Sequence, residues 1–155
     1  MMNSWEIDRV RRHTSPRLNE QIDKVIAEAI QTYSMRSEAA ITRRIDELDR
    51  EWDIERILQT NASSLALAGV LLGVTVNRRW LALSGGVLGF LLLHSVKGWC
   101  PPLPALRRLG VRTRAEIDRE RFALKALRGD FADVENLNQG NSGRVANSVL
   151  RAAER

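Results

Sequence analysis

The sequence has few of the residues that crosslink a chain, bind metals or catalyse reactions. Its 155 residues include one cysteine, Cys100, and two histidines. A single cysteine excludes a disulfide within the chain and any metal site built from several cysteines. There is also no glycine-rich phosphate-binding loop, and no Ser-His-Asp set that the sequence justifies. The sequence therefore predicts no enzyme, with no catalytic residue, no metal site and no cofactor.

Acidic residues are absent from a long central part of the chain. None occurs between Glu55 and Glu116. Residues 61–100 contain three charged residues, all basic, which are Arg78, Arg79 and Lys97. Both ends of the chain are rich in charge of both signs. A chain that is polar at its ends and apolar in its middle indicates insertion of the middle into a membrane.

Lysine is also scarce, because only three of the 24 basic residues are lysines. The net charge of +5 and the pI of about 10.3 would suit a nucleic-acid-binding protein. However, the arginines alternate with acids on expected helices or flank the apolar runs, as they do on the cytoplasmic side of membrane proteins. We therefore expect no nucleic-acid partner. The first 15 residues lack an apolar core and are not a secretory signal.

Two apolar runs separated by a short polar break predict a helical hairpin. The first run, residues 58–76, has a length of about 28 Å as a helix, just enough for a hydrocarbon core of about 30 Å. The second run, residues 80–99, begins and ends with a tryptophan, a residue favoured at membrane interfaces. The break at residues 77–79 is short enough to force an antiparallel pair, and Asn77 suits the left-handed conformation that ends many helices.

The flanking sequences predict further helices, which makes the expected fold class all-α, a two-helix transmembrane hairpin flanked by amphipathic cytoplasmic helices. Ser15 and Pro16 mark a helix start, and the serines within residues 34–37 interrupt that helix. The next helix has one apolar stripe, interpreted as a packed seam or a dimer seam, formed by Ile41, Ile45, Leu48 and Trp52.

After the hairpin, Thr113 and Glu116 form a capping box, and the helix that follows should end at Gly129. Residues 136–143 are expected to be flexible, and residues 144–155 could form a frayed helix.

The charges beside the runs predict the orientation of the hairpin. Within 20 positions of the runs, nine basic residues lie on the outer flanks and two in the turn. The positive-inside rule therefore places both termini in the cytoplasm. Basic and aromatic side chains are expected to lie at the membrane interface and to contact anionic lipids, namely Arg78, Arg79, Trp80, Lys97, Trp99, Arg107 and Arg108.

Small residues recur at helical spacing in both runs, at Gly69, Gly73, Gly85 and Gly89. In lipid, close backbone approach through small residues is a main source of helix packing. These glycines are predicted to close the hairpin or to face a second copy, giving a homo-oligomer. The alternative is that they reflect the general tolerance for glycine in membrane helices.

Two further residues were considered for a chemical role. His94 lies near the end of the second run, where it is an interfacial or packed histidine, or a proton or ligand group. Cys100 follows Trp99, and nearby basic residues could lower the pKa of its thiol. The prolines after Cys100 deny it a helix N-terminus, which favours a structural or interfacial cysteine.

Several of these motifs together resemble a known family. Residues 77–80 (NRRW), 98–101 (GWCP) and 109–113 (LGVRT) frame the second run, and the chain resembles the YgaP-like transmembrane domain over residues 58–113. The resemblance implies a bacterial inner-membrane hairpin that associates as a dimer. In the namesake the hairpin is fused to a rhodanese domain. This chain lacks that domain and its active-site loop, so sulfurtransferase activity is not implied.

The sequence thus predicts three segments: a charged helical region at residues 1–57, the hairpin at 58–100, and a basic helical region with a flexible tail at 101–155. The leading hypothesis is a membrane anchor for charged cytoplasmic helices that self-associate or bind a partner protein. One alternative is an oligomeric accessory for transport of a small anion or a sulfur species across the membrane. Another is a soluble bundle with residues 65–96 as its core.

Overall fold

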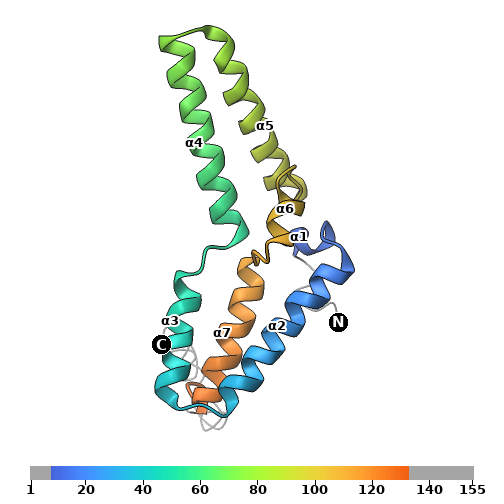
Figure 1. Ribbon diagram of the computed structural model, residues 1–155, viewed down its shortest axis with the longest axis vertical. Coiled ribbons are helices and arrows are strands. Elements are labelled where there is room, and N and C mark those ends of the chain that lie inside the picture. Colours follow the sequence, from blue (N-terminus) through green and yellow to red (C-terminus); the bar gives the residue numbers. More distant parts are fainter. Residues whose placement is uncertain (1–7, 133–155) are drawn as a thin grey trace, which may run out of the picture. The chain divides into compact units, whose positions relative to one another are not determined.

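The computed structural model describes residues 8–132, so the predictions for residues 1–7 and for the tail fall outside it (Figure 1). The described residues form helices and contain no strand, which confirms the all-α class. The elements are α1 (Arg9–Arg12), α2 (Pro16–Ser34), α3 (Glu38–Arg50), α4 (Ile54–Thr75), η2 (Arg78–Trp80), α5 (Leu81–Lys97), α6 (Leu103–Arg108) and α7 (Arg114–Arg128).

These elements form two compact units. We call residues 8–24 and 52–117 the hairpin unit, and residues 25–51 and 118–132 the helical unit. Both α2 and α7 contribute to both units, so the units cut across the three consecutive segments predicted from the sequence. Each unit is described separately below.

The hairpin of the hairpin unit consists of α4, η2 and α5. Helix α4 begins four residues earlier than predicted, because the Asp53 side chain accepts a hydrogen bond from the backbone N–H of Arg56 at 2.7 Å. The prediction for Asn77 is wrong: its backbone is extended, with φ of −159°. Its side chain instead accepts from the N–H of Arg79 at 2.9 Å and starts η2. The left-handed residue that ends a hairpin helix is Gly98, with φ of 74°.

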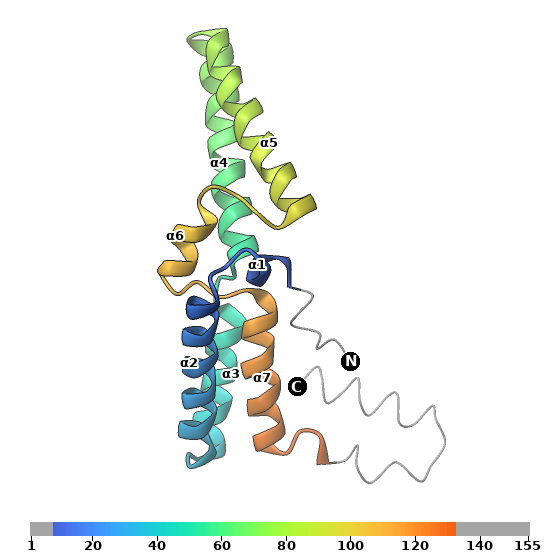
Figure 2. The ribbon, with the colours of Figure 1, turned by 90° about the vertical axis from the view of Figure 1, so that its right-hand side faces the viewer.

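Helices α4 and α5 run antiparallel and lie side by side in both views (Figures 1 and 2). The Ser84 hydroxyl donates to the carbonyl of Ala66 at 2.8 Å across the pair. Toward α6 the two helices separate (Figure 2). A small core fills the α6 end of the hairpin unit, made by Val10, Ile54, Leu58, Cys100 and Leu103.

The helical unit contains the second half of α2, helix α3 and most of α7. Its buried apolar side chains include Ile26, Ile41, Ile45, Leu48 and Leu124. The stripe predicted on α3 is therefore buried at its first three positions. The inclusion of Trp52 in that stripe is wrong, because α3 ends at Arg50 and Trp52 is 47% exposed.

Candidate functional site

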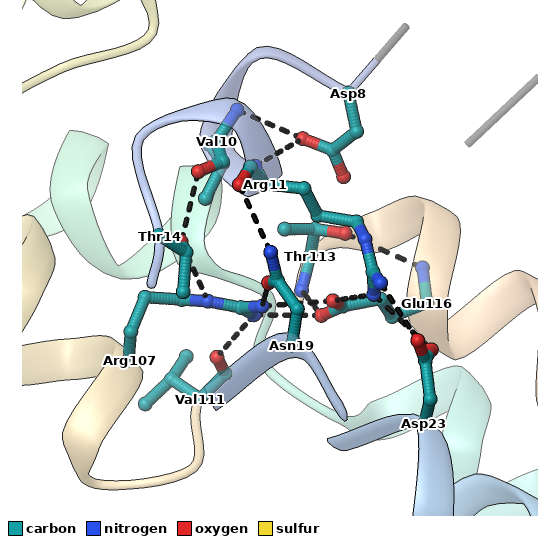
Figure 3. A network of polar contacts seen from close by, with 10 residues as sticks. All are labelled: Asp8, Val10, Arg11, Thr14, Asn19, Asp23, Arg107, Val111, Thr113 and Glu116. Carbon is teal, nitrogen blue, oxygen red and sulfur yellow. Dashed lines mark hydrogen bonds and ion pairs between the residues drawn. The ribbon is translucent and has the colours of Figure 1, made fainter. Parts of the chain in front are cut away.

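A buried charged cluster lies at the α6 end of the hairpin unit (Figure 3). At its centre is Arg107 in the last turn of α6, whose side chain is 1% exposed. Its guanidinium donates to both carboxylate oxygens of Glu116, from Nη1 at 2.7 Å and from Nη2 at 2.8 Å. This planar, two-bond arrangement is the strongest form of an arginine–carboxylate pair.

The remaining N–H groups of Arg107 are also matched. Nε donates to the Thr14 hydroxyl at 3.1 Å, Nη1 to the carbonyl of Val111 at 3.1 Å, and Nη2 to the side-chain oxygen of Asn19 at 2.9 Å. An arginine has five N–H donors, and here all five have an acceptor. A buried charge with every hydrogen bond formed costs far less than one left unpaired.

Arg11 joins the same cluster from α1. Its Nη1 donates to Glu116 at 2.6 Å and its Nη2 to Asp23 at 2.8 Å. We call Arg11, Asp23, Arg107 and Glu116 the ion-pair cluster, which carries two positive and two negative charges and is neutral. Because its members come from α1, α2, α6 and α7, the cluster holds these four segments together within the hairpin unit.

Glu116 also caps α7, as the sequence predicts. Its Oε2 accepts from the N–H of Thr113 at 2.9 Å, and its own N–H donates to the Thr113 hydroxyl at 3.3 Å. Burial alone raises the pKa of Glu116, but hydrogen bonds from Arg107, Thr113 and Arg11, together with the charge of Arg107, outweigh it and lower the pKa. A carboxylate held this way by four donors is a structural anion and is poorly suited to proton transfer.

This placement corrects the prediction for Arg107. A side chain that is 1% exposed has no surface left for lipid headgroups. Glu116 was recognised only as half of a capping box, and the roles of Arg11 and Asp23 were missed. The available signal was Glu116 itself, the first acid after a basic stretch of 60 residues that includes Arg107.

The other predicted interface residues lie on the surface. Trp80 is 44% and Trp99 is 39% exposed, and the side chains of Arg78, Arg79, Lys97 and Arg108 are also exposed. Arg78, Arg79 and Trp80 form η2 at the hairpin tip, and the remaining three lie at or beyond the other end of α5. The structure thus places these six side chains in two groups, one at each end of the hairpin.

The four glycines occupy two different environments. A Cβ added at Gly69 would overlap the Ser84 hydroxyl, and one at Gly73 would lie 2.7 Å from a methyl carbon of Leu81. A Cβ added at Gly85 or Gly89 would meet no atom within 4 Å. Gly69 and Gly73 therefore allow the close approach of α4 and α5, whereas Gly85 and Gly89 take no part in that contact.

His94 is 5% exposed, and its Nδ1 is buried with no hydrogen-bond partner among residues 8–132. Next to it lies a cavity of about 470 Å³ lined partly by Asp8, Arg9, Glu55 and Thr113. In residues 8–132 no group of three His, Cys, Asp or Glu side chains is arranged to hold a metal ion. His94 therefore borders a mixed polar cavity that has no metal-binding geometry.

Cys100 is 7% exposed and belongs to the small apolar core. Burial raises the pKa of its thiol, which keeps it protonated and a poor nucleophile at neutral pH. The lowering of its pKa by nearby basic residues that was considered from the sequence does not occur. The geometry favours a packing role for Cys100.

A second, apolar cavity of about 400 Å³ lies between α4 and α5 where they separate. Its walls come from one face of α4, one face of α5, and the segment that leads into α6. They are formed by Leu58, Asn61, Ala62, Leu65, Val87, Phe90, Leu91, Cys100, Pro101, Pro102 and Leu106. This volume and lining are within the range of small-ligand sites in proteins.

Comparison with known proteins gives no relative for the chain: no family model, no curated protein and no solved structure matches it.

Proposed function

We propose that this chain is an integral membrane protein in which α4 and α5 form a membrane-spanning hairpin that anchors the charged helices. The observation that carries the proposal is the exposure of the hairpin's apolar surface. In the most apolar 18-residue window of each candidate span, 17% and 11% of the residues are buried. Large apolar side chains face outward along both helices, among them Leu67, Leu71, Val74, Leu92 and Val96.

This exposure argues against the soluble-bundle hypothesis. That hypothesis needs residues 65–96 to be the core of the protein, yet Leu67 is 60% exposed and Leu92 is 66% exposed. Contiguous apolar surface of this kind is rare on soluble monomers and marks contact with a membrane or a partner. Helix length supports the membrane: α4 has 22 residues and a length of about 33 Å, against a hydrocarbon core of about 30 Å.

The orientation is part of the proposal. Nine basic residues flank the hairpin on the side of its termini and two lie at the tip, which favours cytoplasmic termini. The bacterial inner membrane and the homodimer are proposed from the resemblance to the YgaP-like family. The charged helical unit then lies in the cytoplasm, where it self-associates or binds a partner protein.

The transport alternative needs a route that connects its proposed residues. Arg78 and Arg79 lie at the tip of the hairpin, and His94 lies in the last turn of α5 at the opposite end. Two packed helices do not enclose such a route. The transport hypothesis therefore depends on an oligomer. We therefore propose anchoring and association rather than transport.

Alkaline carbonate extraction of membranes from cells that express the chain tests the anchor. We expect the protein to stay in the membrane pellet, and its release into the supernatant would refute the proposal. The variant Leu67→Arg places a charge at the centre of the apolar run 58–76 in α4 and should reduce the membrane fraction, because such a charge costs about 2.5–3.5 kcal/mol on insertion. The matched control is Leu127→Arg on α7, an exposed leucine outside the hairpin; it should leave the membrane fraction unchanged.

A further inference from the structure

The cavity between α4 and α5 lies within the hairpin unit. The two helices are in contact at Gly69, Gly73 and Ser84, and they separate from there toward α6 (Figure 2). At the α6 end of the hairpin unit, the small core brings together residues of α1, α4, α6 and the segment that leads into α6, among them Val10 and Leu103. The two helices are therefore in contact toward the tip of the hairpin and separated toward α6.

Helix α6 and the segments next to it are held in place by several contacts. Arg107 fixes α6 through its five hydrogen bonds, and Leu103 on the same helix is fully buried in the small core. The backbone of α1 packs against Gly98, where an added Cβ would lie 3.0 Å from the Arg9 carbonyl carbon. These contacts hold in place the segment that lines the α6 end of the cavity.

The lining specifies an apolar occupant. Ten of the eleven lining residues are apolar, and Asn61 is the one polar side chain among them. Leu65 and Phe90 at the cavity are 51% and 48% exposed, so the cavity is open to the same surroundings as the outer faces of the hairpin. If the hairpin spans a membrane, those surroundings are hydrocarbon, and an empty gap would forfeit the dispersion contacts of its walls.

The shape of the cavity favours a lipid chain over a helix from a second copy. Cys100, Pro101 and Pro102 line the cavity beside α6. A helix has a diameter of about 10–12 Å, so a cavity of about 400 Å³ would hold only roughly one of its turns. A flexible hydrocarbon chain can enter sideways from the bilayer and stop there.

The charge around the cavity favours an anionic lipid. The exposed charged side chains within three residues of a lining residue along the chain are Glu55, Arg56, Lys97 and Arg108, which are three basic residues and one acid. Arg108 is exposed at the end of α6, two residues after the lining residue Leu106. Basic side chains near a membrane surface attract anionic headgroups by about 1 kcal/mol each.

We propose that this cavity holds one acyl chain of an anionic phospholipid as a retained ligand of the hairpin. The inference rests on the proposed membrane insertion and adds a specific lipid site to it. The lipid completes the packing of α4 against α5 where the protein itself leaves a gap, and its headgroup lies on the basic side of the hairpin beside α6.

Photo-crosslinking with a defined lipid tests this site. The full chain is reconstituted into phosphatidylcholine vesicles that contain a small fraction of phosphatidylglycerol with a diazirine in one acyl chain, and adducts are mapped by mass spectrometry. We expect adducts to concentrate on peptides carrying Leu65, Phe90 and Leu106 rather than on those carrying Leu71 and Leu92. Unlabelled phosphatidylglycerol should compete with the probe better than unlabelled phosphatidylcholine.

A matched pair of variants on α4 isolates the cavity. Ala62→Trp fills it and should reduce the adducts at Phe90 and Leu106 several-fold. Ala68→Trp makes the same change at an exposed position that does not line the cavity, and should retain the wild-type pattern. Circular dichroism of both variants verifies that the helices are intact, so that loss of the adducts reports on the cavity.

Three results would overturn the lipid site. Adducts spread evenly over the outer faces would show ordinary surrounding lipid, and the absence of adducts at Leu65, Phe90 and Leu106 would show that no lipid occupies the cavity. Equal competition by the two lipids would remove the preference for anionic headgroups. Carbonate extraction of the same membranes is scored separately, so a protein that stays membrane-bound without a cavity adduct refutes the site and leaves the anchor standing.

Discussion

Arg107 and Glu116 are buried charges that the fold surrounds completely with partners. Taking a charged group out of water costs several kcal/mol unless it is paired and hydrogen-bonded. Here the two side chains form a two-bond pair, and Arg11 and Asp23 extend it to a neutral set of four charges. At this scale the cluster's role is to fix segments that are distant in sequence, because Arg11 and Glu116 are separated by 105 positions.

We predict that Glu116→Gln strongly destabilises the hairpin unit. The amide has almost the same shape but no charge, so Arg107 is left buried without its counter-ion. Breaking a buried pair from one side costs about 3–5 kcal/mol. Thermal unfolding in a mild detergent, followed by circular dichroism, measures the change. The control is Asp49→Asn, which breaks the more exposed Arg121–Asp49 pair and should cost at most about 1 kcal/mol. Equal effects of the two substitutions would contradict the prediction.

The same pair predicts a dependence of stability on pH. The pKa of Glu116 is lower in the folded protein than in the unfolded chain, where the pKa of a glutamate is about 4.3. Its contribution is therefore fully present above that value and is lost as the pH falls through the folded pKa. We expect the stability difference between wild type and Glu116→Gln to shrink below about pH 4 in unfolding measurements. A difference that stays constant from pH 7 to pH 3 would argue against this.

At the scale of the element, the two faces of α5 have different roles. Ser84 faces α4, where its hydroxyl binds the carbonyl of Ala66 and fits against Gly69. Gly85 and Gly89 lie away from this contact, with open space where their side chains would be. Helix α5 thus contacts α4 through one face. Another face carries small residues that no other part of residues 8–132 covers.

These two faces give distinguishable mutant effects. Gly69→Ile should disrupt the hairpin, because the new side chain overlaps Ser84. Gly85→Ile should leave the hairpin intact and weaken the proposed homodimer, because it blocks close approach of a second copy. Thermal unfolding in detergent reports the first effect and crosslinking yield reports the second. A dimer that is unchanged by Gly85→Ile and by Gly89→Ile would exclude this surface as the interface.

At the scale of the whole molecule, charge and apolar surface are segregated along the chain. The hairpin presents leucine and valine side chains outward, and the basic residues at its base outnumber those at its tip. The helical unit contains ion pairs such as Arg44–Glu120 at 2.9 Å and Arg121–Asp49 at 2.7 Å. The first surface suits a bilayer and the second suits water, which is the division that an anchored protein needs.

Topology reporters test this arrangement directly. Alkaline phosphatase, which is active only outside the cytoplasm, should be inactive when fused to the C-terminus and active when fused after Arg79 at the tip of the hairpin. Green fluorescent protein at the C-terminus should give the complementary signal. The positive-inside rule is the physical reason, since basic flanking segments resist translocation. An active phosphatase at the C-terminus would reverse the proposed orientation.

Local features of the structure follow from local sequence. The start of α2 at Pro16, the break between α2 and α3, the capping box at Thr113 and the stop at Gly129 all occur where the sequence predicts them. Each depends on residues within about one helical turn. The errors at Asn77 and Trp52 came at helix ends, where the choice between capping and turn conformations depends on the next element.

The sequence by itself determined the helical class, the apolar hairpin and the segregation of charge, because periodicity, turn length and composition are properties of neighbouring residues. Only the tertiary structure decided that Arg107 is buried with Glu116, that Gly69 and Gly85 face different surroundings, and that α4 and α5 leave a cavity between them. Each of these depends on how segments far apart in the chain pack in three dimensions. The spacing of residues along the sequence does not give the distance in space between such segments.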